Sequence, residues 1–291
     1  MSLENTYNRS SNTISKLIDT SLSIIKIFIR SKFNLKLPET ENNSCIVLGN
    51  GPSLKDSLIK HNDFFKQNQL VCVNSFATTS EFSELKPQYY VILDDSFWKS
   101  DGEIVVETIE ALRSKTNWTL NLFIPQIASR SDRYTNLCKQ NSNIKLQYYN
   151  YTVFNGSETI ANWFYKKNLA MPQSQNVLVA SIFLSINLGF KEIYLVGADH
   201  SWHQNLHVDE NNVVCVKDVH FFENEENVKY RPFNKGIYIN ETFKMHEILT
   251  AWSKAFYGYI ALNKYAVHQN CKIYNCSELS FIDAFERKKI N

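Results

Sequence analysis

Hydrophobic residues in this chain gather in short runs, and several runs end in a small polar cluster. The runs at residues 45–48, 69–73, 87–93, 120–125, 144–151, 191–196 and 271–276 have the length of strands. Most are apolar at successive positions, which is typical of parallel strands covered by helices on both faces. Helix-length segments lie between them, at residues 54–66, 103–113, 158–166, 176–188 and 242–265. The pattern predicts an α/β protein with a mostly parallel sheet flanked by helices.

The N-terminal segment has a different character. Residues 1–12 are polar, and we expect them to be disordered. Residues 13–36 predict a basic amphipathic helix, which would lie on an anionic membrane surface or pack on its own domain or another subunit. We therefore divide the chain into this tail and helix, residues 1–42, and a globular domain, residues 43–291. The irregular insertion at about 201–240 is typical of a substrate-covering lid, and residues 280–285 predict a closing helix.

Polar clusters follow four of the predicted strands. They are Gly49-Asn50-Gly51, Asn74-Ser75, Asp94-Asp95-Ser96 and Gly197-Ala198-Asp199. Ligands of open parallel sheets bind beyond the carboxyl ends of the strands. We therefore expect the four clusters to converge on one crevice.

The first cluster opens a tight turn, Gly49-Asn50-Gly51-Pro52-Ser53, that precedes a helix. Its glycines let a ligand approach the backbone, Ser53 can cap, and the N–H groups of a helix start attract anions. The turn is a candidate cradle for a nucleotide phosphate. A plain strand–turn–helix connection fits it equally well, because it is neither a GxGxxG nor a P-loop sequence.

The net charge and the cysteines narrow the class of protein and the compartment in which we expect it. A net charge of +2 over 291 residues gives no reason to expect nucleic acid as a partner. Six scattered cysteines without a CxxC pair argue against a zinc site or a disulfide framework and favour a reducing compartment. No segment has the pattern of a secretory signal or of a spanning helix. We expect a cytoplasmic protein, with a peripheral position at the inner membrane left open by the N-terminal helix.

Five of the seven histidines fall within one stretch of the chain: His200, His203, His207, His220 and His246. A histidine can take the proton of an attacking hydroxyl, and His220, in the predicted lid, is the first candidate, with His200 second. Asp199 is an alternative base, a ribose contact or a turn cap. His200, His203, Asp199 and Asp209 could also ligate a metal, but the spacing is weak evidence and we expect none.

A second set of polar residues could hold a phosphate or the acceptor. Tyr230 and Arg231 can stabilise the charge on a departing nucleotide, and His203 can bind phosphate or sugar. An exposed charged run accounts for Tyr230 and Arg231 as well.

Three stretches together resemble a known family: GNGPSLK at residues 49–55, LGFKEIYLVGAD at 188–199 and KIYNCSELSFIDAF at 272–285. They are similar to bacterial sialyltransferases of glycosyltransferase family 42 and to the broader 6-hydroxymethylpterin diphosphokinase-like group, over roughly residues 44–287. The resemblance implies a single Rossmann-like domain, a variant of the GT-A fold, with a lid. It also implies a CMP-sugar donor, a histidine base, lid tyrosines near the leaving phosphate, and neither metal nor cofactor.

The resemblance also assigns residues. Asn50 and Gly51 match loop residues that contact CMP, Asn74 matches a nucleotide-binding asparagine, and Asp94 stands where sialyltransferases have an asparagine. Asp199 matches the acid after the glycine turn. Ser277 and Ser280 lie in the block near the cytidine, and Gly49 and Ser53 complete the loop. The chain departs from the family at Asn176-Val177-Leu178, where sialyltransferases have Thr-Ser-Gly, and His220 is assigned by position alone.

Three functions remain open on this basis. The first is a glycosyltransferase that moves a sialic-acid-like sugar from a CMP donor to a glycan or lipid-linked acceptor in surface polysaccharide synthesis. The second is a pterin diphosphokinase, which needs ATP and Mg²⁺, with Asp94, Asp95 and Asp199 as candidate carboxylates. The third is a non-catalytic nucleotide-sugar-binding protein. Whether the chain forms a homo-oligomer also stays open.

Overall fold

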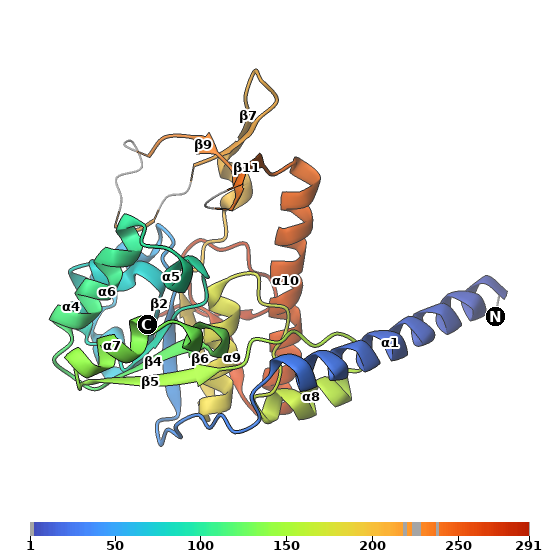
Figure 1. The fold of residues 1–291 in the computed structure, drawn as a ribbon, viewed down its shortest axis with the longest axis horizontal. Helices are drawn as coiled ribbons and strands as arrows, with labels where there is room; N and C mark the ends of the chain where they lie inside the picture. The colour runs from blue at the N-terminus through green and yellow to red at the C-terminus, as the bar shows by residue number, and fades with distance from the viewer. Residues whose placement is uncertain (1–2, 218–219, 223–227, 237–238, 291) are drawn as a thin grey trace.

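A computed structural model describes residues 3–217, 220–222, 228–236 and 239–290 of the chain (Figure 1). Its centre is one sheet of eight strands, in the order β13-β12-β6-β1-β2-β3-β4-β5. Every pair of neighbours in this sheet is parallel. The strands are β1 (Ser44–Leu48), β2 (Gln69–Val73), β3 (Tyr89–Val91), β4 (Leu120–Pro125), β5 (Ile144–Tyr149), β6 (Glu192–Val196), β12 (Lys272–Asn275) and β13 (Glu286–Arg287). The predicted α/β fold is confirmed.

Helices cover both faces of the sheet. One face packs against α8 (Glu158–Lys166), α9 (Val177–Leu188) and α10 (Met245–His268). The other packs against α2 (Leu54–Lys60), α3 (Asn62–Gln67), α4 (Glu81–Leu85), α6 (Glu103–Lys115) and α7 (Arg133–Gln140). Shorter helical segments are η1 (Asn74–Thr78), α5 (Ser96–Lys99), η2 (Gln126–Arg130) and η3 (Trp202–Asn205).

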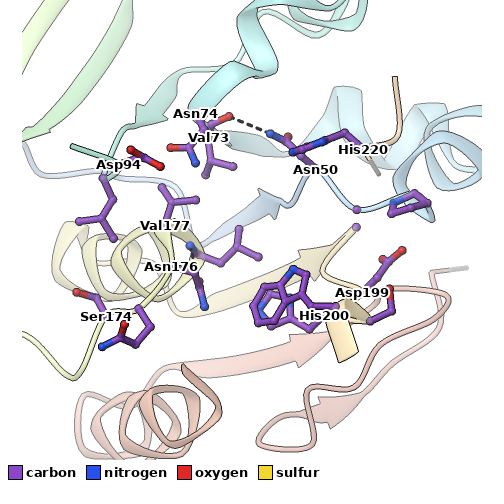
Figure 2. Close-up of a pocket in the computed structure, with 18 of the residues that line it drawn as sticks. Asn50, Val73, Asn74, Asp94, Ser174, Asn176, Val177, Asp199, His200 and His220 are labelled. Carbon is purple, nitrogen blue, oxygen red and sulfur yellow. Dashed lines mark hydrogen bonds between the residues drawn. The ribbon is translucent and has the colours of Figure 1, made fainter. Parts of the chain in front are cut away.

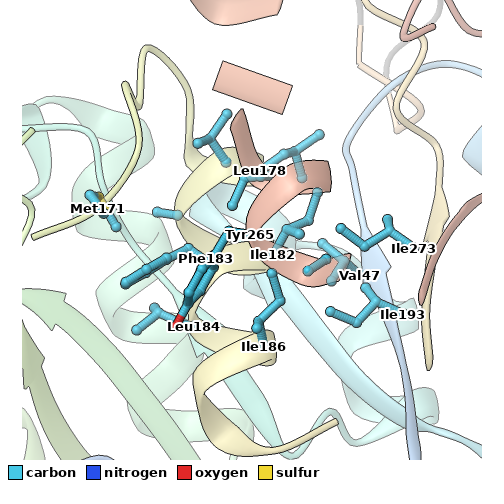
Figure 3. Close-up of a cluster of buried hydrophobic side chains, with 14 of the residues drawn as sticks. Val47, Met171, Leu178, Ile182, Phe183, Leu184, Ile186, Ile193, Tyr265 and Ile273 are labelled. Carbon is cyan, nitrogen blue, oxygen red and sulfur yellow. The ribbon is translucent and has the colours of Figure 1, made fainter. Parts of the chain in front are cut away.

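Burial on both faces explains the unbroken apolar runs. Along β1, Cys45 and Val47 join the core under α9, whereas Ile46 and Leu48 join the core on the opposite face. Helix α9 is buried on nearly all sides, between the sheet and α10 (Figure 3). Its composition fits this position, because a helix that is apolar all round has no solvent face.

The chain reverses direction across the sheet at β1. Strands β1 to β5 follow one another outward, and the chain then returns to place β6 on the other side of β1. Ligands of open parallel sheets bind beside such a switch point, at the carboxyl ends of the strands. The turns after β1 and β6 therefore face each other.

Helix α1 (Leu3–Arg30) extends away from the sheet, with its C-terminal half on the domain (Figure 1). Residues 3–12, predicted to be disordered, continue this helix, since extending an existing helix adds one hydrogen bond per residue fixed. The helix ends before residue 36 because the next residues bond elsewhere. The Lys32 N–H donates to Asn150 Oδ1 and the Ser31 hydroxyl donates to the Leu169 carbonyl. None of the described helices is both long enough and apolar enough to cross a membrane.

Three other predicted helices differ from the structure in their bounds or in whether they form. The helix predicted at 54–66 is broken at His61 into α2 and α3. Helix α10 begins at Met245 because Thr242 ends a strand, and Glu247 accepts from the Lys244 N–H to form its cap. Residues 280–285 are not helical, since the Asn275 amide donates to the Ile282 carbonyl and holds this segment beside the sheet.

The insertion after β6 contains two small antiparallel sheets. One is formed by β7 (Leu206–Val208), β8 (Val214–Val216) and β9 (Arg231–Pro232), and the other by β10 (Asn234–Gly236) and β11 (Ile239–Thr242). Parts of the predicted lid, residues 218–219, 223–227 and 237–238, lie outside the described residues.

Candidate functional site

A cavity of about 620 Å³ lies at the carboxyl ends of the central strands (Figure 2). All four polar clusters contribute to its wall: Asn50 and Gly51, Asn74, Asp94 and Asp95, and Gly197 and Asp199. The volume is in the range of small-molecule sites. Segments separated by about half the chain thus meet in one place, because the sheet order puts β6 next to β1.

Glycines allow the turns after β1 and β6 to touch. The Gly49 N–H donates to the Val196 carbonyl at 2.8 Å, and the Gly51 N–H donates to the Gly197 carbonyl at 2.9 Å. A Cβ on Gly49 would stand 2.3 Å from the Gly197 oxygen, and one on Gly51 would stand 2.7 Å from it. Gly197 has φ +68, a conformation that glycine adopts without strain. Gly49 therefore lies behind the cavity, as a spacer between the turns.

Asp199 connects the same two turns through its side chain. Its carboxylate accepts the Ser53 N–H at 2.9 Å and the Ser53 hydroxyl. Burial raises the pKa of the Asp199 carboxyl above its usual range, and the two hydrogen bonds from Ser53 partly oppose that rise. Asp199 lines the cavity and Ser53 stands behind it, so the pair joins the start of α2 to the turn after β6.

The C-terminal block supports this turn from the rear. The Ala198 N–H donates to Ser277 Oγ at 2.9 Å, and the Ser280 hydroxyl donates to the Ala198 carbonyl at 2.7 Å. Neither serine is part of the cavity wall. Their hydrogen bonds to Ala198 hold the turn after β6 in place.

Four buried polar atoms in the wall have no hydrogen-bond partner among the described residues. They are Asn50 Oδ1, Asn74 Oδ1, Ser174 Oγ and Asn176 Nδ2. Two of the amides have fixed orientations. Asn50 donates through Nδ2 to the Val73 carbonyl, and Asn176 accepts through Oδ1 from the N–H groups of Leu178 and Val179. Buried polar groups are normally paired, so these atoms indicate a ligand with several donors and acceptors.

His200 is held as a neutral ring. Burial lowers the pKa of His200 to about 3, and its Nε2 lies 2.6 Å from the Tyr259 hydroxyl. Tyr259 donates its proton to Asn176 Oδ1, so His200 Nε2 carries the hydrogen of their contact. The ring also packs on Trp202, with centroids 4.1 Å apart. At neutral pH such a weak base is poorly suited to take a proton from a hydroxyl.

His220 stands at the rim of the cavity beside Asn50 (Figure 2). The following residue anchors it, because the Phe221 N–H donates to the Asn50 carbonyl at 3.1 Å and the Phe221 ring packs on Phe76. The His220 ring stacks on Phe222, with centroids 5.2 Å apart. This imidazole is half-buried and lines the cavity.

The residues predicted to hold the leaving phosphate or the acceptor lie elsewhere. His203 is exposed and meets the edge of the Phe281 ring, and Tyr230 is exposed with its ring 5.7 Å from His207. Arg231 pairs with Val216 in the small sheet. None of the three lines the cavity as the structure has it.

The residues on one side of the cavity wall were not predicted from the sequence. Ser174, Gln175 and Asn176 come from the loop before α9, and Trp202 comes from η3. The signal for Asn176 is its place directly before an apolar helix, where an asparagine caps. Nothing in the sequence showed that this helix end faces the turn after β1.

Acidic residues in the cavity wall raise the question of whether the cavity could hold a metal ion. Asp94, Asp95 and Asp199 line the cavity, yet no group of three or more His, Cys, Asp or Glu within the described ranges is placed to hold a metal ion.

Comparisons with known proteins give two findings. The family model described as 6-hydroxymethylpterin diphosphokinase MptE-like matches residues 18–205. Among solved structures, the MAf glycosyltransferase from Magnetospirillum magneticum AMB-1 is similar, with a TM-score of 0.50 and 13% sequence identity. The similarity covers 89% of this chain and 35% of that chain, and it shows a shared fold. No curated protein matches the chain.

Proposed function

We propose that this chain, which belongs to the 6-hydroxymethylpterin diphosphokinase MptE-like family, is a glycosyltransferase that uses a nucleotide-sugar donor. The observation that carries the proposal is the set of four unpaired polar atoms in the cavity wall. Acceptors on Asn50 and Asn74, the donor on Asn176 and the hydroxyl of Ser174 suit the base and hydroxyl groups of a nucleoside and a sugar. The fold shared with a glycosyltransferase supports the same class.

A CMP-linked donor is the one that the resemblance of residues 49–55, 188–199 and 272–285 to sialyltransferases implies. Asp94, Asp95 and Asp199 are the acidic groups that face the cavity. Carboxylates repel phosphates, and a CMP-sugar would bring a single phosphate near them, with the carboxylate of a sialic-acid-like sugar placed elsewhere in the cavity. A sialic-acid-like sugar is the expected transferred group, and a hydroxyl of a glycan or lipid-linked molecule is the expected acceptor.

His220 is the proposed general base. The acceptor oxygen attacks the anomeric carbon as His220 takes its proton, and the bond from that carbon to the phosphate oxygen breaks. CMP leaves with the electron pair, and one displacement inverts the anomeric centre. The neutral His200 and the indole of Trp202 offer an aromatic surface beside the reacting groups.

The family description favours one alternative, a pterin diphosphokinase that acts on Mg-ATP. The exposed carboxylates of Asp94 and Asp95 could hold Mg²⁺ through the phosphates of the nucleotide. The kinase would need Mg²⁺, whereas the proposed glycosyltransferase would act without a metal ion.

A thermal-shift panel of CMP, UDP, GDP and ATP, each with and without Mg²⁺, separates them. We expect CMP to raise the melting temperature without metal. A shift given by Mg-ATP alone would overturn the proposal and favour the kinase.

Two variants refine the panel. Asn176→Asp keeps the oxygen that caps α9 but loses the free Nδ2, so it should fold and lose most of the CMP shift. His220→Gln should keep the CMP shift and slow hydrolysis of CMP-N-acetylneuraminate by about 100-fold or more. Unchanged turnover in His220→Gln would reject His220 as the base, and a CMP shift without any turnover of a sugar donor would favour a binding protein.

A further inference from the structure

Helix α1 packs on the domain through the side that carries Thr20, Ser23 and Ile27. Ser23 and Ile27 are buried there, and the Ser23 hydroxyl donates to the Asn155 carbonyl at 2.9 Å. Nearby, Thr20 Oγ1 accepts the Ser157 N–H at 2.8 Å. The contact fixes the C-terminal half of the helix and leaves the opposite side of α1 facing outward.

That outward side carries the large apolar residues of the helix. The apolar stripe consists of Ile14, Leu17, Ile18, Leu22, Ile25, Phe28 and Ile29, each at least 50% exposed. Their spacing of three and four residues places them on one side of the helix. A row of seven exposed large apolar side chains on one side of a helix is typical of an interaction site.

A second cavity, of about 1020 Å³, lies at the C-terminal end of the stripe. Its wall includes four cationic side chains, Lys26, Arg30, Lys32 and Arg130. No carboxylate belongs to this wall, and none of the four cations has an ion-pair partner within the described part of the chain. Ile29 lines the cavity too, so the apolar stripe runs directly into the basic wall.

We propose that α1 lies on a membrane through the apolar stripe, and that the basic cavity binds the phosphate of an anionic lipid in that membrane. An apolar side flanked by lysine and arginine fits the boundary between acyl chains and anionic headgroups. A second copy of the chain fits less well, because it would bring two sets of unpaired cations together.

The basic cavity also adjoins the candidate active site. Tyr151 and Ser174 line both cavities. On the premise of the proposed function, a lipid phosphate bound there would hold a lipid-linked acceptor next to the donor. Membrane binding itself does not depend on that premise.

Vesicle flotation of the full chain tests the proposal. Vesicles of equal parts phosphatidylcholine and phosphatidylglycerol should bind the protein, and vesicles of phosphatidylcholine alone should bind it at least fivefold more weakly. The double variant Ile18→Gln with Ile25→Gln should lose tenfold or more in binding. Its matched control, Ile59→Gln with Ile104→Gln, changes exposed isoleucines on α2 and α6 and should bind as the wild type does.

The charge variant Arg30→Gln with Arg130→Gln should lose about fivefold in binding per removed charge, on anionic vesicles only. Its control is Lys66→Gln with Lys139→Gln, which are exposed lysines outside the basic cavity. Circular dichroism melts should be the same for all four variants, because every substituted side chain is exposed.

Three results would overturn the proposal. One is a wild-type protein that does not bind anionic vesicles, even if it binds inorganic phosphate. Another is equal binding by the stripe variant and its control. The third is a dimer in light scattering that the stripe variant converts to a monomer. Failure of the CMP shift would reject the proposed function and leave the vesicle result intact.

Discussion

At the scale of single residues, burial decides what the polar groups of the site can do. Asp199 resembled a base in the sequence, yet its carboxylate accepts two hydrogen bonds from Ser53. His200 resembled a second base, yet its Nε2 is taken by Tyr259 and its ring is buried. Both residues belong to the cavity wall, and for these reasons our proposal assigns proton transfer to His220.

The low pKa of His200 predicts a pH dependence of stability. Its pKa is about 3 in the folded chain and about 6.5 when unfolded, so the unfolded state binds more protons between these values. The free energy of unfolding should therefore fall as pH drops from about 6.5 toward 3, by up to about 1.4 kcal/mol per pH unit from this group. The raised pKa of Asp199 acts in the opposite sense, because that carboxyl gains a proton more readily in the folded chain.

Urea unfolding of the wild type and of His200→Asn at several pH values isolates the histidine. Asparagine tolerates the left-handed backbone, φ +53, at this position. The variant should be less stable at pH 7 but show a shallower decline below pH 6.5. The exposed His246→Asn should keep the slope of the wild type, and an unchanged slope in His200→Asn would contradict the assignment.

At the scale of elements, the two glycine turns form the rear of the site. They lie so close that a Cβ on Gly51 would stand 2.8 Å from the Asp199 carboxyl group. Neither backbone nor the buried carboxylate can move freely. The turns after β1 and β6 therefore depend on each other for their shape.

Gly51→Ala should destabilise the chain by about 1–3 kcal/mol, because the added methyl overpacks this contact. It should also abolish the CMP shift, since the turn lines the cavity. Thermal unfolding and the nucleotide panel measure the two effects.

Gly102→Ala is the matched control. A Cβ at Gly102 would meet only Ser100 Oγ, at 3.5 Å, which is an ordinary contact. We expect a loss below about 1 kcal/mol and a normal CMP shift. Equal behaviour of the two variants would show that the turns can separate at little cost.

At the scale of the whole molecule, the sheet order assembles the site from distant segments. The loop after β1, the residues after β2, the loop before α9 and the turn after β6 all reach one cavity. A ligand there should contact all of them at once. The site is thus a property of the sheet more than of any one motif.

Hydrogen exchange with and without CMP tests this assembly. Residues 49–53, 73–75, 174–178 and 197–202 should gain protection together, because all four segments include residues of the cavity wall. Residues 103–115, in α6, serve as the internal reference and should exchange unchanged. Protection confined to one of the four segments, or centred on α6, would contradict a shared site.

The sequence alone determined the elements and the class of fold. Unbroken apolar runs such as residues 69–73 and 120–125 predict buried parallel strands, and the structure has strands at those residues. The resemblance carried by residues 49–55, 188–199 and 272–285 agrees with the family that the chain belongs to. These features are local, because the pattern of residues adjacent in the chain indicates both the burial of a strand on two faces and the position of a turn.

Only the tertiary structure decided which polar residues share a cavity. The sequence grouped Ser53, Ser277 and Ser280 with Asn50 and Asn74, but the three serines stand behind the wall and support the turn after β6. It gave no place to Ser174 or the free amide of Asn176, and it left open whether the N-terminal helix packs on its own domain, where the structure buries Ser23 and Ile27. Contacts between residues far apart in the chain depend on strand order and on which side of a helix is buried, and neither is fixed by local pattern.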